Sequence, residues 1–169
     1  MPESNETPSN DTPKPFRAGY VSILGRPNVG KSTILNTLVG IKLAAVTDKP
    51  QTTRNRISGI LTTSTAQFIF LDTPGIIEPR YRLQQRMVKT AFDSARDADV
   101  ILYVMDAPSA PHRADDAVLE KIPATNAPIL LVLNKIDRIA KPLLLPILEE
   151  YNKRGIFEEL VPISARRQD

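Results

Sequence analysis

The order of apolar and polar residues along the chain predicts alternating strands and helices. Six short apolar runs, rich in β-branched side chains, have the length and composition of strands. They cover residues 18–24, 57–62, 66–71, 100–105, 129–133 and 160–163. The runs at 100–105 and 129–133 are continuously apolar, which is typical of parallel strands that are buried on both faces.

Four stretches between these runs carry apolar side chains at the three-to-four-residue spacing of helices. They are residues 32–39, 83–96, 114–122 and a last helix that begins near 144–146 and ends at about 154. Pro146 would then lie in the first turn, where proline is tolerated. The short polar segment 63–65 predicts a hairpin. The whole pattern predicts an α/β fold: a mostly parallel six-stranded sheet with one antiparallel edge strand and helices on both faces.

Composition narrows the chemistry. The 169 residues, 41% hydrophobic and 24% charged, are sufficient for one globular domain with a substantial core. The absence of Cys excludes disulfides, thiolate nucleophiles and zinc–thiolate sites, and the single histidine, His112, excludes multi-histidine metal sites. A net charge of +3 is too small to argue for an RNA partner. No apolar run approaches the roughly 20 residues of a membrane span, and the N-terminus lacks the apolar core of a signal peptide.

Residues 1–16 are expected to form a disordered leader, and residues 17–169 the folded domain. The segment through Pro15 contains four prolines among polar residues and no aliphatic residue beyond Met1. Such a segment cannot bury enough apolar surface to offset its ordering entropy. A short interaction motif is the alternative interpretation.

Residues 25–32, Gly-Arg-Pro-Asn-Val-Gly-Lys-Ser, match the phosphate-binding loop pattern G-x-x-x-x-G-K-[ST] between a predicted strand and a predicted helix. Glycines let the backbone approach a phosphate, successive N–H groups point inward, and the helix N-terminus adds its positive dipole. We expect Lys31 to reach the β- and γ-phosphates and the Ser32 hydroxyl to bind Mg²⁺. A glycine turn before an ordinary helix is the alternative.

Two further elements favour a Mg²⁺-nucleotide site. Asp72 follows a predicted strand and begins Asp-Thr-Pro-Gly, so its carboxylate is expected to help hold Mg²⁺. The backbone N–H of Gly75 is expected to contact a γ-phosphate. Thr52 and Thr53, in the polar stretch 41–56, are candidates for a hydroxyl ligand of Mg²⁺ in the triphosphate state, with Thr53 preferred. An Asp that begins a turn, and threonines that lead into a strand, are the alternatives.

The sequence Asn134-Lys135-Ile136-Asp137 indicates which base is bound. Guanine offers an N1–H and an N2 amine, and the carboxylate of Asp137 can accept from both, whereas adenine lacks this arrangement. Asn134 would brace the loop and bond the purine, and the stem of Lys135 would lie over the ring. After the last predicted strand, Ser164-Ala165 places a backbone N–H where guanine O6 could accept a hydrogen bond from it.

These elements together resemble the small regulatory GTPases. The segments 25–32, 49–54 and 72–76 resemble the bacterial Era family in particular, and the similarity covers about residues 17–165. The related Der and MnmE-type GTPases usually carry a different threonine segment, often with Asp after its Arg, so Asn55 favours Era. The G domain of a Der/MnmE-type GTPase remains the alternative. The resemblance implies a three-layer P-loop NTPase (Ras-like) fold, GTP or GDP as ligand, Mg²⁺ as cofactor and GTP hydrolysis.

The expected site contains three groups of residues. The nucleotide-binding candidates are Gly25, Pro27, Asn28, Val29, Gly30, Lys31, Ser32, Thr33, Asn134, Lys135, Asp137, Ser164 and Ala165. The metal ligands expected are Ser32, Thr53 and Asp72. The catalytic candidates are Lys31, Asn28, Thr53 and Gly75.

The family pattern has a catalytic consequence. Ras-type enzymes place a water-orienting Gln directly after the Asp-x-x-Gly motif, where this chain has Ile76. An aliphatic side chain cannot orient water, so we expect slow intrinsic hydrolysis. Relatives with this substitution often recruit K⁺ with an Asn of the phosphate loop, and Asn28 occupies that position. K⁺ would supply the positive charge that an arginine finger supplies elsewhere; an Asn28 that only stabilises a turn is the alternative.

Era proteins continue into a last helix and an RNA-binding KH domain. This sequence ends at Asp169 and contains no GXXG loop, so we expect an isolated GTPase domain that stops before its final helix. The resemblance implies that the whole protein binds small-subunit ribosomal RNA and the 30S subunit and acts in small-subunit assembly. It further implies a monomer in the cytoplasm, with peripheral association at the inner membrane face left open. An adaptor for RNA or protein with incidental hydrolysis is the alternative function.

Overall fold

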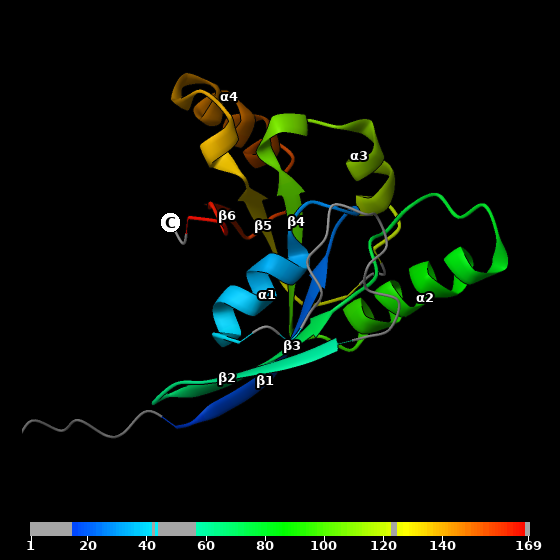
Figure 1. The fold of residues 1–169 in the computed structure, drawn as a ribbon, viewed down its shortest axis with the longest axis vertical. Coiled ribbons are helices and arrows are strands. Elements are labelled where there is room, and N and C mark those ends of the chain that lie inside the picture. Colours follow the sequence, from blue (N-terminus) through cyan, green and yellow to red (C-terminus); the bar gives the residue numbers. More distant parts are fainter. Residues whose placement is uncertain (1–14, 42, 44–56, 123–124, 168–169) are drawn as a thin grey trace, which may run out of the picture.

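A computed structural model of the chain describes residues 15–41, 43, 57–122 and 125–167. One six-stranded sheet runs through this part of the molecule, flanked by helices (Figure 1). Its strands are β1 (Arg17–Leu24), β2 (Ile57–Thr62), β3 (Ala66–Asp72), β4 (Val100–Asp106), β5 (Ile129–Asn134) and β6 (Glu159–Pro162). The helices are α1 (Lys31–Val39), α2 (Arg82–Arg96), α3 (Arg113–Leu119) and α4 (Lys141–Asn152), with 3₁₀ turns η1 (Ala107–Ser109) and η2 (Ile136–Arg138).

The strand order is β2-β3-β1-β4-β5-β6. Only the pairing of β2 with β3 is antiparallel; the other neighbours are parallel. This difference follows from the connections, because the short 63–65 segment can join only antiparallel strands, whereas the parallel strands are linked through helices. The predicted fold class, including the antiparallel edge strand, is confirmed.

Alternate residues of the central strands supply two hydrophobic cores, one on each face of the sheet. On β4, Ile101, Tyr103 and Met105 belong to the core that α2, α3 and α4 cover. Val104 belongs to the core beneath α1, which is built on Ile34 and Leu35 of that helix. Side chains alternate between the faces of a strand, so a continuously apolar strand such as β4 supplies both cores at once.

Two helices differ from the prediction. α4 begins at Lys141 rather than near 144–146, so Pro142 is the first-turn proline and Pro146 lies inside the helix. Pro146 lacks the N–H for an intrahelical hydrogen bond, yet the helix continues to bury Tyr151, which is 0% exposed. Packing of this side chain overrides the local preference against proline. α3 is shorter than expected and ends at Leu119.

The topology brings the polar segments that follow the strands to one edge of the sheet. β1, β3, β5 and β6 lead into residues 25–32, 72–75, 134–137 and 164–165, and these strands run parallel to one another. In open α/β sheets this carboxyl edge is where ligands bind. In the described part of the chain, no helix has the length and apolarity needed to cross a membrane.

Candidate functional site

The loop between β1 and α1 is shaped by Gly30, which precedes the helix with φ +107°. This is a left-handed conformation that L side chains rarely adopt. A Cβ on Gly30 would also lie 2.2 Å from Nδ2 of Asn134, too close for any real contact. Glycine is therefore required here both by the backbone and by the side chain that packs against it.

Lys31, the first residue of α1, is held inside the loop. Its side chain is buried, and Nζ donates to the carbonyl oxygens of Gly25 at 3.1 Å and Arg26 at 2.9 Å. Burial lowers the pKa of Lys31 from 10.5 to about 8, and the charge of Asp72 offsets part of that effect. A buried ammonium group that donates to carbonyl oxygens, with the Asp72 carboxylate compensating only part of its desolvation, favours the arrival of an anion.

Ser32 and Asp72 meet where β3 ends beside α1. Ser32 Oγ donates to Asp72 Oδ2 at 2.8 Å, and Asp72 is fully buried. The next side chain, Thr73, donates to the carbonyl of Ile23 at 2.7 Å and fixes the exit of β3 against β1. A hydroxyl and a carboxylate oxygen at this spacing fit Mg²⁺, which takes few protein ligands and completes its shell with nucleotide phosphates and water. No cluster of three or more His, Cys, Asp or Glu that could hold a metal occurs among the described residues.

Gly75 and Ile76 close the segment after β3 onto the phosphate loop. A Cβ on Gly75 would lie 2.7–2.8 Å from atoms of Pro27, so only glycine permits this approach. The Ile76 N–H donates to the Gly25 carbonyl at 3.1 Å. Ile76 is 3% exposed and packs in the core covered by α2, so its side chain points away from the nucleotide edge.

Asn134 joins three of the predicted segments. Its Nδ2 donates to the carbonyl of Val29 at 2.9 Å, and its Oδ1 accepts the backbone N–H of Ala165 at 3.0 Å. The side chain is buried. Asn134 therefore links the phosphate loop to the segment after β6, the contacts that its predicted bracing role requires. The backbone N–H of Ala165 was expected to face guanine O6. In this structure it donates to Asn134 Oδ1 instead.

The turn that follows Asn134 presents Lys135 and Asp137 at the surface edge of the site. Lys135 has φ +63°; its Nζ donates to the carbonyl of Asn28 at 2.5 Å and lies 3.6 Å from Asp106 Oδ2. Asp137 Oδ1 accepts from Ser164 Oγ at 2.7 Å. This hydrogen bond is the main cause that lowers the pKa of Asp137, so its carboxylate is the charged form that base recognition requires.

Asn28 and Thr33 complete the expected loop residues. Asn28 is exposed with φ +63°, a conformation that Asn tolerates better than most residues. Thr33 is half-buried on α1 and its carbonyl accepts from Thr37 Oγ1 at 3.0 Å. Thr52 and Thr53 lie outside the described residues.

The structure adds residues that the sequence motifs do not include. Arg26 Nε donates to both oxygens of Asp115 on α3 at 3.0 Å, and its Nη2 donates to Ser109 Oγ at 2.8 Å. The sequence contains one signal: Asp115 precedes Val118 and Leu119 at helical spacing, so a carboxylate stands on the apolar face of its helix. Charged residues are almost never buried without a partner, which would have indicated an ion pair but not its identity.

The comparisons with known proteins agree with this geometry. A family model described as 50S ribosome-binding GTPase matches residues 20–135. The chain belongs to this GTPase family. The family accounts for the fold and for the placement of the phosphate-loop motif at the carboxyl edge of the sheet.

Solved structures of Era resemble this GTPase domain closely. One is the structure of Era in complex with MgGDPNP and a fragment of 16S ribosomal RNA. Its sequence is 42% identical to this chain, the TM-score is 0.86, and the match covers 90% of this chain and 53% of that chain. Another is an Era variant from Aquifex aeolicus bound to GDP and AlF4⁻. It is 43% identical, the TM-score is 0.82, and the match covers 89% of this chain and 52% of that chain. The chain thus spans about half the length of these relatives. A bacterial selenocysteine-specific elongation factor, at 18% identity and TM-score 0.70, with 90% of this chain and 26% of that chain covered, shares the fold.

Proposed function

We propose that residues 17–169 form a domain that binds guanine nucleotide with Mg²⁺ and hydrolyses GTP as a molecular switch. The observation that carries this proposal is the grouping at one sheet edge of a buried Lys31, the Ser32–Asp72 pair at 2.8 Å and the Asn134 link to the base-recognition segments. Asn134 would thereby join the phosphate end and the base end of the proposed nucleotide site. Family membership and the nucleotide-bound Era structures support the same function.

Ser32 and Asp72 would hold Mg²⁺, Ser32 through its hydroxyl and Asp72 through its carboxylate. When bound, the ion neutralises charge on the β- and γ-phosphate oxygens. Lys31 would place its ammonium group against the same phosphates, exchanging the Gly25 and Arg26 carbonyls for phosphate oxygens. The remaining loop residues, from Gly25 through Thr33, would enclose the phosphates with backbone N–H groups.

Asp137 would select guanine. Its carboxylate is held by Ser164 Oγ, and bidentate acceptance from guanine N1–H and N2 amine discriminates against adenine. Lys135 would cover the ring with its stem. Guanine O6 would accept a hydrogen bond from the Ala165 N–H, which Asn134 Oδ1 accepts in this structure.

The switch would involve two segments. Loss of the γ-phosphate would release the Gly75 segment, which rests on Pro27 of the phosphate loop, together with the stretch that contains Thr53 as an expected Mg²⁺ ligand. Intrinsic hydrolysis would be slow, because the buried Ile76 side chain cannot orient water. K⁺ at the exposed Asn28 would raise the rate; equal rates in K⁺ and Na⁺ buffers would exclude that part of the proposal.

The whole protein is proposed to act in small ribosomal subunit assembly. One Era structure contains a 16S ribosomal RNA fragment, and this chain corresponds to about half of that protein. We propose a cytoplasmic location, with peripheral membrane association as an additional proposal, and a monomeric domain. The rival function, an adaptor whose hydrolysis is incidental, gains support if Lys31→Ala abolishes partner binding in a protein with negligible turnover even in K⁺.

A nucleotide competition experiment tests the central claim. GTP and ATP compete against labelled GDP in Mg²⁺ buffer, on the unchanged domain and on Asp137→Ala. GTP should compete at least about a hundredfold better than ATP on the unchanged domain, since the site would leave Asp137 unpaired with adenine. Most of that preference should vanish in the variant. Equal competition by ATP and GTP on the unchanged domain would overturn the proposal.

A further inference from the structure

Three of the residues between the two glycines of the phosphate loop, Arg26, Pro27 and Asn28, contact different parts of the molecule. Pro27 packs closely against Gly75: a Cβ on Gly75 would lie within 2.8 Å of Pro27 atoms. The carbonyl of Asn28 accepts the Lys135 ammonium at 2.5 Å. Arg26 is held through its side chain by η1 and α3. The first two contacts join segments expected in the site; the third leads to a helix that no nucleotide motif includes.

The Arg26 guanidinium is enclosed by acceptors. Nε donates to both carboxylate oxygens of Asp115 at 3.0 Å, and Nη2 donates to Ser109 Oγ at 2.8 Å and lies 3.4 Å from Asp106 Oδ1. Tyr103, fully buried on β4, donates its hydroxyl to Asp115 Oδ1 at 3.1 Å. The carboxylate of Asp115 therefore receives charge-assisted hydrogen bonds from a cation and a hydroxyl, an arrangement that makes its complete burial tolerable.

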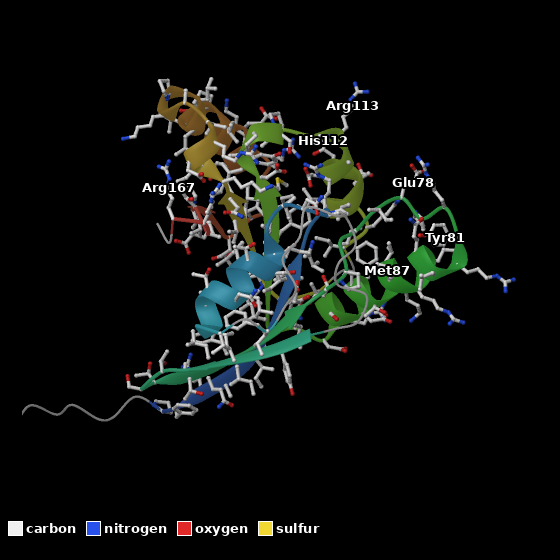
Figure 2. All side chains as sticks on the ribbon, viewed as in Figure 1. Glu78, Tyr81, Met87, His112, Arg113 and Arg167 are labelled. Atoms are coloured by element: carbon white, nitrogen blue, oxygen red, sulfur yellow. The ribbon has the colours of Figure 1, made fainter. Side chains whose placement is uncertain are left out.

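Asp115 faces inward from α3, on the same buried side of the helix as Val118. It is 0% exposed, whereas Arg113 at the start of α3 is exposed and extends away from the body of the molecule (Figure 2). A buried carboxylate on a seven-residue helix is costly unless it has a specific partner. That partner is a residue of the phosphate loop.

We infer that Asp115 is a positioning residue for nucleotide binding, which acts by fixing Arg26 and, through the Arg26 carbonyl, the Lys31 ammonium. The inference rests on the proposed function. Its geometric basis is that the Arg26 backbone carbonyl, 2.9 Å from Lys31 Nζ, belongs to the residue whose side chain Asp115 anchors. Releasing the anchor lets the loop backbone move, so Lys31 and the neighbouring N–H groups lose their alignment toward a phosphate. α3 thereby becomes a determinant of nucleotide affinity.

The adjacent residue provides a matched control. Asp116 lies on the same helix and pairs with Arg154, beyond the end of α4. Asp116→Asn therefore removes an arginine–carboxylate pair of α3 that does not touch the phosphate loop. A general loosening of α3 would affect both variants, whereas a role through Arg26 is specific to Asp115.

The experiment measures GDP affinity by calorimetry, with Mg²⁺, for the unchanged domain, Asp115→Asn, Asp116→Asn, Arg26→Gln and the Asp115→Asn/Arg26→Gln double variant. Asp115→Asn should weaken GDP about tenfold, and Asp116→Asn less than about twofold. The double variant should bind GDP no more weakly than Arg26→Gln, because both changes remove the same interaction.

Melting temperatures without nucleotide identify any loss of stability. If Asp115→Asn does not fold, Ser109→Ala, which removes the 2.8 Å acceptor of Arg26, should weaken GDP about threefold.

Each outcome has one meaning. Unchanged GDP affinity in a folded Asp115→Asn, or in Ser109→Ala where that variant replaces it, overturns the inference. An equal loss in Asp116→Asn, or additive losses in the double variant, overturns it too, since either indicates loosening without a path through Arg26. Failure of the unchanged domain to bind GDP would instead contradict the proposed function.

Discussion

Lys31 and Lys135 stand in the two motifs that would contact opposite ends of a nucleotide, and the fold holds them in different ways. Lys31 is buried, and its ammonium group rests on carbonyls of its own loop. Lys135 is half-buried; it lies between the Asn28 carbonyl and the Asp106 carboxylate. At the proposed phosphate end Lys31 donates to carbonyls of its own loop, and a bound anion would replace those contacts. At the proposed base end the charge of Lys135 is already compensated by Asp106.

The largest effect expected from this difference is on Lys31. Lys31→Ala removes the only buried ammonium group among the described residues and should weaken GDP binding by about 4 kcal/mol, roughly a thousandfold. Lys135→Ala should cost far less, because its ammonium group stays partly hydrated and acts through a backbone carbonyl. Fluorescence titration with a labelled GDP measures both, and equal losses in the two variants would remove the distinction.

The pH dependence of stability sharpens the same point. In the nucleotide-free domain the pKa of Lys31 falls from 10.5 to about 8, so between these pH values the unfolded chain binds a proton that the folded domain does not. The free energy of unfolding should therefore rise with pH across this window, by about 3 kcal/mol from this group.

Lys31→Met serves as the control for that measurement, because it keeps the stem and removes the titrating group. Urea unfolding at about pH 8 and about pH 10, inside the window between the two pKa values, should show the rise in the unchanged domain relative to Lys31→Met. Parallel pH profiles in the two proteins would mean that Lys31 is not destabilised by burial. Binding of a phosphate should reduce this rise, since an anion favours the charged lysine.

The contact between the two ends is tested by Gly30→Ala. The added methyl would meet Asn134 Nδ2 at 2.2 Å and force a left-handed backbone to carry a side chain, so we expect a loss of about 2–3 kcal/mol in the free energy of unfolding. Gly40→Ala is the control, because Gly40 has φ +74° but nothing within 4 Å of a Cβ; it should cost about 1 kcal/mol. Thermal unfolding of the two variants separates the clash from backbone strain.

The smallest expected effect isolates one hydrogen bond at the base end. Inosine triphosphate lacks the N2 amine of guanine, so the unchanged domain should prefer GTP to it by about tenfold, or about 1.4 kcal/mol. Asp137→Ala should bind both nucleotides weakly and with similar affinity. Competition against labelled GDP measures both preferences. A preference for GTP that survives in the variant would show that the amine is recognised by another group.

Much of the fold and of the site's placement could be predicted from local sequence. Apolar runs marked all six strands, and the motifs at 25–32 and 134–137 indicated the sheet edge, because each follows a run that is buried in the structure. The start of α4 was predicted too late, because the preference of proline for a first turn is a local signal that placed Pro146 there. The burial of Tyr151, which keeps the helix intact around Pro146, depends on the whole fold. The Arg26–Asp115 pair joins residues 89 positions apart. The periodicity of apolar residues gives no information on which distant side chains form an ion pair. The roles of the individual site residues remain predictions.

The hydrogen bond from Ala165 N–H to Asn134 Oδ1 at 3.0 Å has a spectroscopic consequence. A backbone proton held by a side-chain amide changes its chemical shift whenever that amide turns or a competing acceptor arrives. Asn134 also bonds the Val29 carbonyl at 2.9 Å, so disturbance of the phosphate loop would reach the same proton. In a ¹⁵N-labelled domain, the single Ala165 resonance should therefore respond to occupancy at either end of the site.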